Sequence, residues 1–244
     1  MSLSFRSAAL VFGLAALWSA SPATAETSTP SAQSVSESHY AEVESFLLSV
    51  LGQEKQERRT TAEAIVEASS ASLEQDPGNV SAHLTYVAAL GTLARTLDPS
   101  ESIKGRYGSK SRDAIQALQR VAPDDPVAGA LAGVWHLEVA RRGGFAGSFL
   151  LGASPQEGKA LLDEALQADA ANPMLPFAYA VALSAQDPKS NKSKILDLLG
   201  QCQSRASLKP SALSDLIGQN AEHLAALLGS DQHTEARTFA ENVM

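Results

Sequence analysis

The sequence predicts an all-α protein, and three observations support that fold class. Alanine, the residue with the highest helix propensity, is abundant, whereas aromatic residues make up only 5% of the 244 residues. Between turn signals, apolar residues recur at three- and four-residue intervals, as on one face of a helix. Asp or Asn followed by proline ends helical segments at Pro77, Pro126 and Pro173, which stand 49 and 47 residues apart. This regular spacing predicts repeated helix pairs.

The first 25 residues are typical of a secretory signal peptide. Arg6 precedes an apolar run from Ala8 to Ala20, and Ala23-Thr24-Ala25 has the form of a cleavage site. A membrane anchor is the alternative, but a run of about 13 apolar residues is shorter than the roughly 20 that a spanning helix needs. We therefore expect cleavage near Ala25, a periplasmic or secreted protein, and no stable membrane span.

The remaining chain divides into a spacer, a repeat domain and a tail. Residues 26–36 are rich in Ser, Thr and Pro and predict a flexible spacer. Residues 37–229 carry the helical pattern, and residues 230–244 form a weaker helix that either caps the array or frays. A first helix is expected from Glu37 to Leu51. The charged run from Gln53 to Arg59 alternates in sign and is interpreted as a solvated helix face.

Three helix pairs come next in the repeat domain. We expect them at residues 80–97 with 111–121, 127–142 with 154–168, and 175–185 with 192–202, before a longer helix at 210–228. The middle pair has the strongest end signals. Arg141, Arg142 and Gly143-Gly144 are typical of a helix C-terminus, and Ser154-Pro155 with Glu157 is typical of an N-terminus.

The second helix of the middle pair resembles the second helix of tetratricopeptide repeats. Ala160, Ala165-Leu166 and Asn172-Pro173 match that pattern, and Asp76-Pro77 resembles the end of a preceding repeat. The family's period is 34, whereas about 14 extra residues lie between the helices of the first two pairs here. The resemblance covers about residues 62–202. It implies helix pairs stacked as a tetratricopeptide-like α-solenoid that binds protein or peptide partners.

A narrower resemblance rests on the loop of the middle pair. The run Trp135-His136-Leu137-Glu138 and the later Gly152-Ala153-Ser154-Pro155 are similar to the periplasmic T component of tripartite (TRAP-type) solute transporters. That resemblance implies binding or transfer of a small apolar solute.

Charge and motif content argue against several other functions. The net charge of −8 is unfavourable for nucleic-acid binding, and there is neither a Gly-x-Ser-x-Gly elbow nor a phosphate-binding Gly-Lys-Ser/Thr loop. Cys202 is the only cysteine and is expected to be a buried thiol. No metal-ligand spacing occurs among the histidines, which are His39, His83, His136, His223 and His233. We expect no catalytic residues, no metal, no cofactor and no enzymatic activity.

The candidate binding residues come from two inserted segments, about 95–109 and 143–154, interpreted as loops. Both come after the end of a first helix, so stacking should bring them to one side of the array as a partner-binding rim. The rim residues would be Arg95, Arg106, Tyr107, Arg141, Arg142, Phe145 and Phe149. The alternative is structural. The run Phe149-Leu150-Leu151 would fold back into the concave face, the arginines would only cap helix ends, and Trp135 would pack in the core.

Two functions are compatible with these patterns. The first is an exported tetratricopeptide-like scaffold that mediates protein–protein interactions in the cell envelope. The second is a solute-binding or transfer component of a transport system, with an apolar cavity near Trp135 and Phe149. The sequence identifies neither the partner nor the solute.

Overall fold

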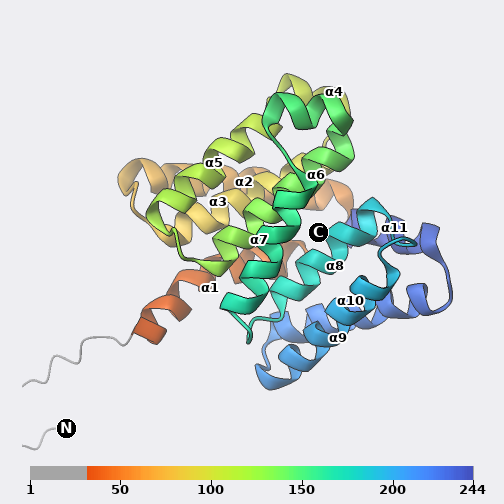
Figure 1. The fold of residues 1–244 in the computed structure, drawn as a ribbon. Helices are drawn as coiled ribbons and strands as arrows, with labels where there is room; N and C mark the ends of the chain where they lie inside the picture. Colours follow the sequence, from red (N-terminus) through yellow and green to blue (C-terminus); the bar gives the residue numbers. More distant parts are fainter. Residues whose placement is uncertain (1–31, 244) are drawn as a thin grey trace, which may run out of the picture.

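The computed structural model describes residues 32–243, with side chains from residue 39 onward (Figure 1). The predicted signal peptide and residues 26–31 of the predicted spacer lie outside this range. Within it the secondary structure is helical and contains no strand, which confirms the all-α fold class. The helices are α1 (Ala32–Val50), α2 (Lys55–Gln75), α3 (Val80–Thr96), α4 (Pro99–Lys104), α5 (Tyr107–Val121), α6 (Pro126–Leu151), α7 (Pro155–Ala168), α8 (Met174–Gln186), α9 (Lys192–Leu208), α10 (Ala212–Gly229) and α11 (His233–Val243).

Helix starts depend on local capping chemistry. The Asn79 side chain accepts a hydrogen bond from the Ala82 N–H at the start of α3, and Ser154 accepts one from the Glu157 N–H at the start of α7. Asp125 caps α6 in the same way, with Pro126 in the first turn. These side chains satisfy amide groups that have no partner inside the helix, while proline has no such group to satisfy. The first described helix, α1, begins at Ala32, earlier than the predicted start at Glu37.

Each predicted helix pair packs together. Helices α3 and α5, α6 and α7, and α8 and α9 are in contact, and the first helices α3, α6 and α8 also touch one another in turn (Figure 1). Helix α8 is the most enclosed, because every residue from Leu175 to Ala185 is buried. These contacts agree with paired helices, and the tetratricopeptide-like stacking itself remains a proposal.

Helices α6 and α7 approach each other at backbone level through two glycines. A Cβ atom placed on Gly133 would lie 2.7 Å from the Gly158 carbonyl oxygen, and one on Gly158 would lie 2.8 Å from the Gly133 carbonyl oxygen. Both distances are shorter than van der Waals contact, so neither position has room for a side chain. The two glycines therefore set the spacing of the best-defined helix pair.

The two ends of the array meet. Helix α1 packs against α3 and α10, and α11 packs against α8 and α10. The side chain of Arg58 on α2 donates a hydrogen bond to the backbone carbonyl of Asn242 on α11. The interpretation of the charged run as a solvated face is thus wrong for Arg58, which is only 3% exposed. The predicted C-terminal tail is helix α11, whose Ala236, Ala240 and Val243 are buried.

The two inserted segments are more helical than expected. The first contains α4 and the start of α5, and the second is largely a continuation of α6 to Leu151. Gly144 has φ 58° and ψ −154°, a glycine conformation outside the left-handed helical region, so the predicted left-handed cap does not form there, and the chain resumes helical geometry after it. The prediction of loops here is wrong, because α4 and the start of α5 occupy the first segment, and a second helical run from Phe145 to Leu151 follows the break at Gly144 in the second.

The single cysteine lies in the core formed by α8, α9 and α10. Cys202 is fully buried, and burial raises the pKa of its thiol to about 12. No helix in the part of the chain described by the structure is long and apolar enough to cross a membrane.

Candidate functional site: an arginine pocket

A pocket of about 240 Å³ lies where α2, α3, α6 and α11 come together. Its lining is dominated by charged side chains, with five cations and two carboxylates. These are Lys55, Arg58, Arg95, Arg141 and Arg142, with Glu138 and Glu241. In a chain whose net charge is −8, this is a local excess of positive charge. We call it the arginine pocket.

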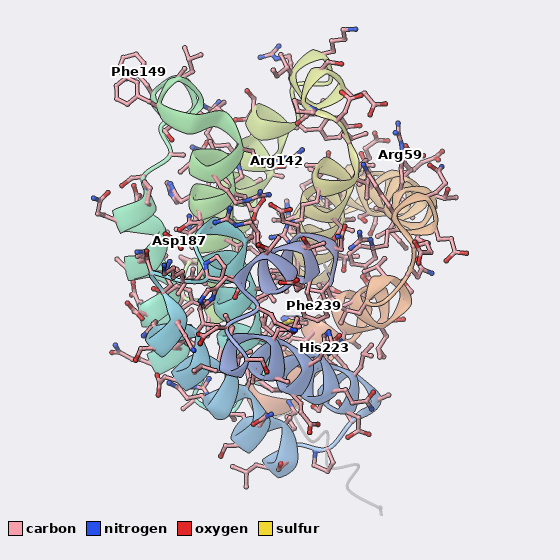
Figure 2. The ribbon with its side chains drawn as sticks, turned by 90° about the vertical axis from the view of Figure 1, so that its right-hand side faces the viewer. Arg59, Arg142, Phe149, Asp187, His223 and Phe239 are labelled. Carbon is pink, nitrogen blue, oxygen red and sulfur yellow. The ribbon has the colours of Figure 1, made fainter. Side chains whose placement is uncertain are left out.

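Helix geometry explains why three of the arginines gather. Arg95 stands at the C-terminal end of α3. Arg141 and Arg142 come just before the kink at Gly144 in α6. Cations are favourable at helix C-termini, where unpaired carbonyl groups carry partial negative charge. Because α3 and α6 pack side by side, their ends bring Arg95, Arg141 and Arg142 to one place. Figure 2 shows Arg142 in the interior of the view and Phe149 at the outer edge.

Glu138 is the carboxylate between two of these arginines. Its Oε1 lies 3.4 Å from Nη2 of Arg95, and its Oε2 lies 3.0 Å from Nη2 of Arg141. Burial alone would raise the pKa of Glu138, but the charges of Arg95 and Arg141 outweigh that effect and lower it. Glu138 is therefore ionised at neutral pH and holds the two guanidinium groups in place.

The side chains of Arg142 and Arg58 donate hydrogen bonds to backbone carbonyl groups rather than to carboxylates. Arg142 donates hydrogen bonds to the carbonyl oxygens of Ala94 (2.5 Å) and Leu97 (3.0 Å), which are otherwise unpaired at the end of α3. The alternative prediction that arginines cap helix ends is confirmed for Arg142. Burial lowers the pKa of Arg142, and the neighbouring Arg141 and Arg95 lower it further, against the opposing effect of Glu138.

The pocket retains unused donors. The Nε atoms of Arg58 and Arg141 are buried and have no hydrogen-bond partner among the described residues. The pKa of Arg58 is lowered by burial and by repulsion from Arg95, so its charge is only partly compensated. Arg141 also binds Glu241, with 2.7 Å between Nη1 and Oε1. A site lined by more cations than carboxylates is suited to a carboxylate or phosphate group.

The remaining predicted rim residues lie elsewhere. Phe145 and Phe149 are 89% and 79% exposed, and Arg106 is exposed with a left-handed φ of 55°. The ring of Tyr107 lies 5.1 Å from Nζ of Lys110. None of the four lines the arginine pocket. The expected single rim is thus divided into a cationic pocket and a separate aromatic surface. The alternative that the run Phe149-Leu150-Leu151 folds back into the concave face is wrong for Phe149 and Leu150, which are 79% and 77% exposed, whereas Leu151 is partly buried against Gly108.

Sequence reasoning missed part of the pocket. Lys55 and Arg58 were included in a solvated helix face, and Glu241 was assigned to the tail. The signal for Glu138 was present, because Glu138 and Arg141 are three residues apart on one helix and such pairs face each other. Nothing local indicates that α2 and α11 would supply the other walls, since those contacts depend on closure of the whole array.

Trp135 and His136 have structural partners. The indole Nε1 of Trp135 donates to the Gly108 carbonyl oxygen at 3.2 Å, and the ring packs against the core of the N-terminal half. The Nδ1 atom of buried His136 accepts from the Ser154 N–H at 3.0 Å, and burial lowers its pKa. Among residues 39–243, no group of three His, Cys, Asp or Glu side chains is arranged to hold a metal ion.

No family model matches the sequence, and no curated protein or solved structure matches it either.

Proposed function

We propose that this chain is an exported, tetratricopeptide-like scaffold that binds an acidic segment of a partner protein, with a carboxylate of that segment in the arginine pocket. The observation that carries the proposal is the surplus of cationic over acidic side chains that line the arginine pocket. Export is inferred from the signal-like residues 1–25, and a binding rather than catalytic role from the absence of catalytic motifs in the sequence.

The size of the pocket favours one anionic group over a whole solute. Pockets that engulf small ligands have volumes of about 300–1,000 Å³, whereas the arginine pocket measures about 240 Å³. Arginine matches a carboxylate geometrically, because its planar guanidinium can donate two parallel hydrogen bonds. A side chain presented by a partner fits this space, and the rest of the partner would lie across the ends of α3 and α6.

The alternative is a solute-binding or transfer component with an apolar cavity beside Trp135 and Phe149. Trp135 is hydrogen-bonded within the packed helices, and Phe149 is exposed. Neither residue lines the arginine pocket or the shallow pocket on α9. We therefore favour the scaffold.

The first prediction concerns binding of an acidic peptide. Arg141→Ala and Lys55→Ala should each weaken binding of a fluorescein-labelled hexaglutamate peptide, the arginine variant by about ten- to hundredfold, because a hydrogen bond to a charged group contributes about 1.5–3 kcal/mol. Glu241→Gln should strengthen binding, since it releases Arg141 from its carboxylate partner. Fluorescence anisotropy measures all three affinities, and added salt should weaken each.

The matched controls keep the charge change but move it away from the pocket. Arg112→Ala removes an arginine that pairs with Asp113, and Glu235→Gln removes an exposed carboxylate on α11. Equal loss of affinity in Arg141→Ala and Arg112→Ala would show that only net charge matters and would contradict the pocket.

Crosslinking and pull-down from the native envelope is a separate experiment that would identify the partner. Recovery of a bound small molecule without a protein would favour the solute alternative.

A further inference from the structure

The kinked end of α6 exposes a group of large apolar side chains. Phe145, Phe149 and Leu150 on α6, with Ile103 on α4, are 89%, 79%, 77% and 77% exposed. We call these four residues the apolar tip. Soluble proteins often expose single apolar side chains, but a cluster of large ones marks an interaction site.

The tip is a built feature of the fold. Phe145 and Phe149 are four residues apart, so they lie on the same face of the helix, and their rings stack with centroids 6.5 Å apart and an interplanar angle of 15°. The side chain of Leu151 packs against Gly108 at the start of α5, and this contact holds the end of α6 in place. Figures 1 and 2 both place α4 and the end of α6 at the upper extremity of the molecule, and Figure 2 shows them on opposite sides of it.

Positively charged side chains lie along α4 and the start of α5, at the same extremity as the apolar tip. Lys104, Arg106 and Lys110 come after Ile103 along α4 and α5, and all three are exposed. The nearby acidic Glu101 is engaged with Arg59, with 3.1 Å between Oε1 and Nη1. The stretch from Gly143 to Ser154 contains no charged residue. This extremity is therefore apolar at its centre and basic beside it, although the chain as a whole is acidic.

We propose that the apolar tip inserts into the interface of a lipid bilayer that contains anionic phospholipid. Apolar and aromatic side chains bind the boundary between headgroups and acyl chains, while neighbouring lysine and arginine residues are attracted to anionic headgroups. Attachment is peripheral, and it uses residues separate from the arginine pocket.

Vesicle co-sedimentation of the purified protein tests this proposal. The protein should sediment with vesicles of equal parts phosphatidylcholine and phosphatidylglycerol, and more weakly with phosphatidylcholine alone. The double change Phe145→Ala with Phe149→Ala should lower the partition coefficient at least about tenfold. Lys104→Gln with Lys110→Gln should lower binding to the anionic vesicles only, and raised salt should reproduce that loss.

Leu208→Ala is the matched control, because Leu208 is an exposed leucine on α9 (82% exposed), outside the tip. It should leave vesicle binding unchanged, and circular dichroism should show that every variant is folded. Failure of the unaltered protein to bind anionic vesicles would overturn the proposal, as would equal losses in the phenylalanine and Leu208 variants. A concentration-dependent dimer that the phenylalanine changes abolish, without vesicle binding, would assign the tip to self-association instead.

Discussion

His136 shows how a single buried residue links the fold to pH. Its Nδ1 accepts the Ser154 N–H, which requires the neutral ring, and its Nε2 lies 3.7 Å from an oxygen of Glu157. Burial lowers the pKa of His136, and the smaller opposing effect of Glu157 does not cancel it. The unfolded chain therefore binds a proton at a higher pH than the folded chain does.

From this shift we predict that the free energy of unfolding falls as pH falls through the ordinary histidine range, near 6.5. Above that range both states are neutral at this residue, and no penalty exists. His136→Asn keeps an acceptor for the Ser154 N–H but cannot titrate, so its stability should depend less on pH. Urea unfolding at about pH 7.5 and about pH 5.5, which bracket the ordinary pKa, measures the difference. Identical pH dependence in both proteins would contradict the assignment.

The residue-level predictions from sequence succeed where the cause is local. Ser154 is a capping residue beside Pro155, and that short-range signal correctly places the start of α7. The burial of Arg58 was not predictable in this way. Its environment is made by Arg95 and Asn242, which come from distant parts of the chain.

At the scale of elements, the contact between α6 and α7 depends on two missing side chains. We predict that Gly158→Ala destabilises the protein by about 1–3 kcal/mol, the usual cost of overpacking a close contact. The added methyl would meet the Gly133 carbonyl oxygen at 2.8 Å and the Cβ of His136 at 2.9 Å. In a helix alone, alanine would be favourable, so the two effects have opposite signs. Thermal unfolding measures which one prevails.

Gly200→Ala is the control for this change. Gly200 is also in a helix, α9, but a Cβ placed there meets no atom within 4 Å. It should raise the melting temperature slightly, through helix propensity alone. A melting temperature that rises equally in Gly158→Ala would show that α6 and α7 can separate without cost.

The same two helices show the limit of predicting elements from sequence. Gly143-Gly144 correctly indicated a break in the helix, yet the residues from Phe145 to Leu151 return to helical geometry. Glycine permits the left-handed conformation but does not determine the backbone geometry of the residues after it. The continuation is held by Leu151 against Gly108, a tertiary contact that no short-range pattern contains. The aromatic part of the predicted rim was misplaced for this reason.

At the scale of the whole molecule, α11 joins the two ends of the array. It packs on α8 and α10, Phe239 stacks edge-on against His223 with centroids 4.9 Å apart, and Arg58 reaches Asn242 from α2. Figure 2 shows His223 and Phe239 close together on the face turned to the viewer. The choice between a cap and a frayed end could not be made from the sequence, because the hydrophobic residues of the tail are few.

We predict that Ala236→Asp destabilises the entire domain and does more than detach α11. Ala236 is fully buried, and a carboxylate there would be left without a partner. We expect a loss of more than about 3 kcal/mol in the free energy of unfolding, in a single transition. Hydrogen exchange should accelerate in α2 and α8 as well as in α11.

Glu235→Gln, at the adjacent exposed position, should leave stability and exchange unchanged. Faster exchange confined to α11 in the Ala236→Asp protein, with the remaining helices protected as before, would show that the array is stable without its last helix.

The hydrogen bond from the Arg58 side chain to the Asn242 carbonyl also constrains the order in which the parts of the structure can fold. It joins positions 184 residues apart, and contacts of such separation are slow to form because a long loop must close first. Because α2 is synthesised long before α11, one wall of the arginine pocket is missing until α11 has been made. The pocket is therefore complete, and available for a partner, only after α11 has packed against the other helices.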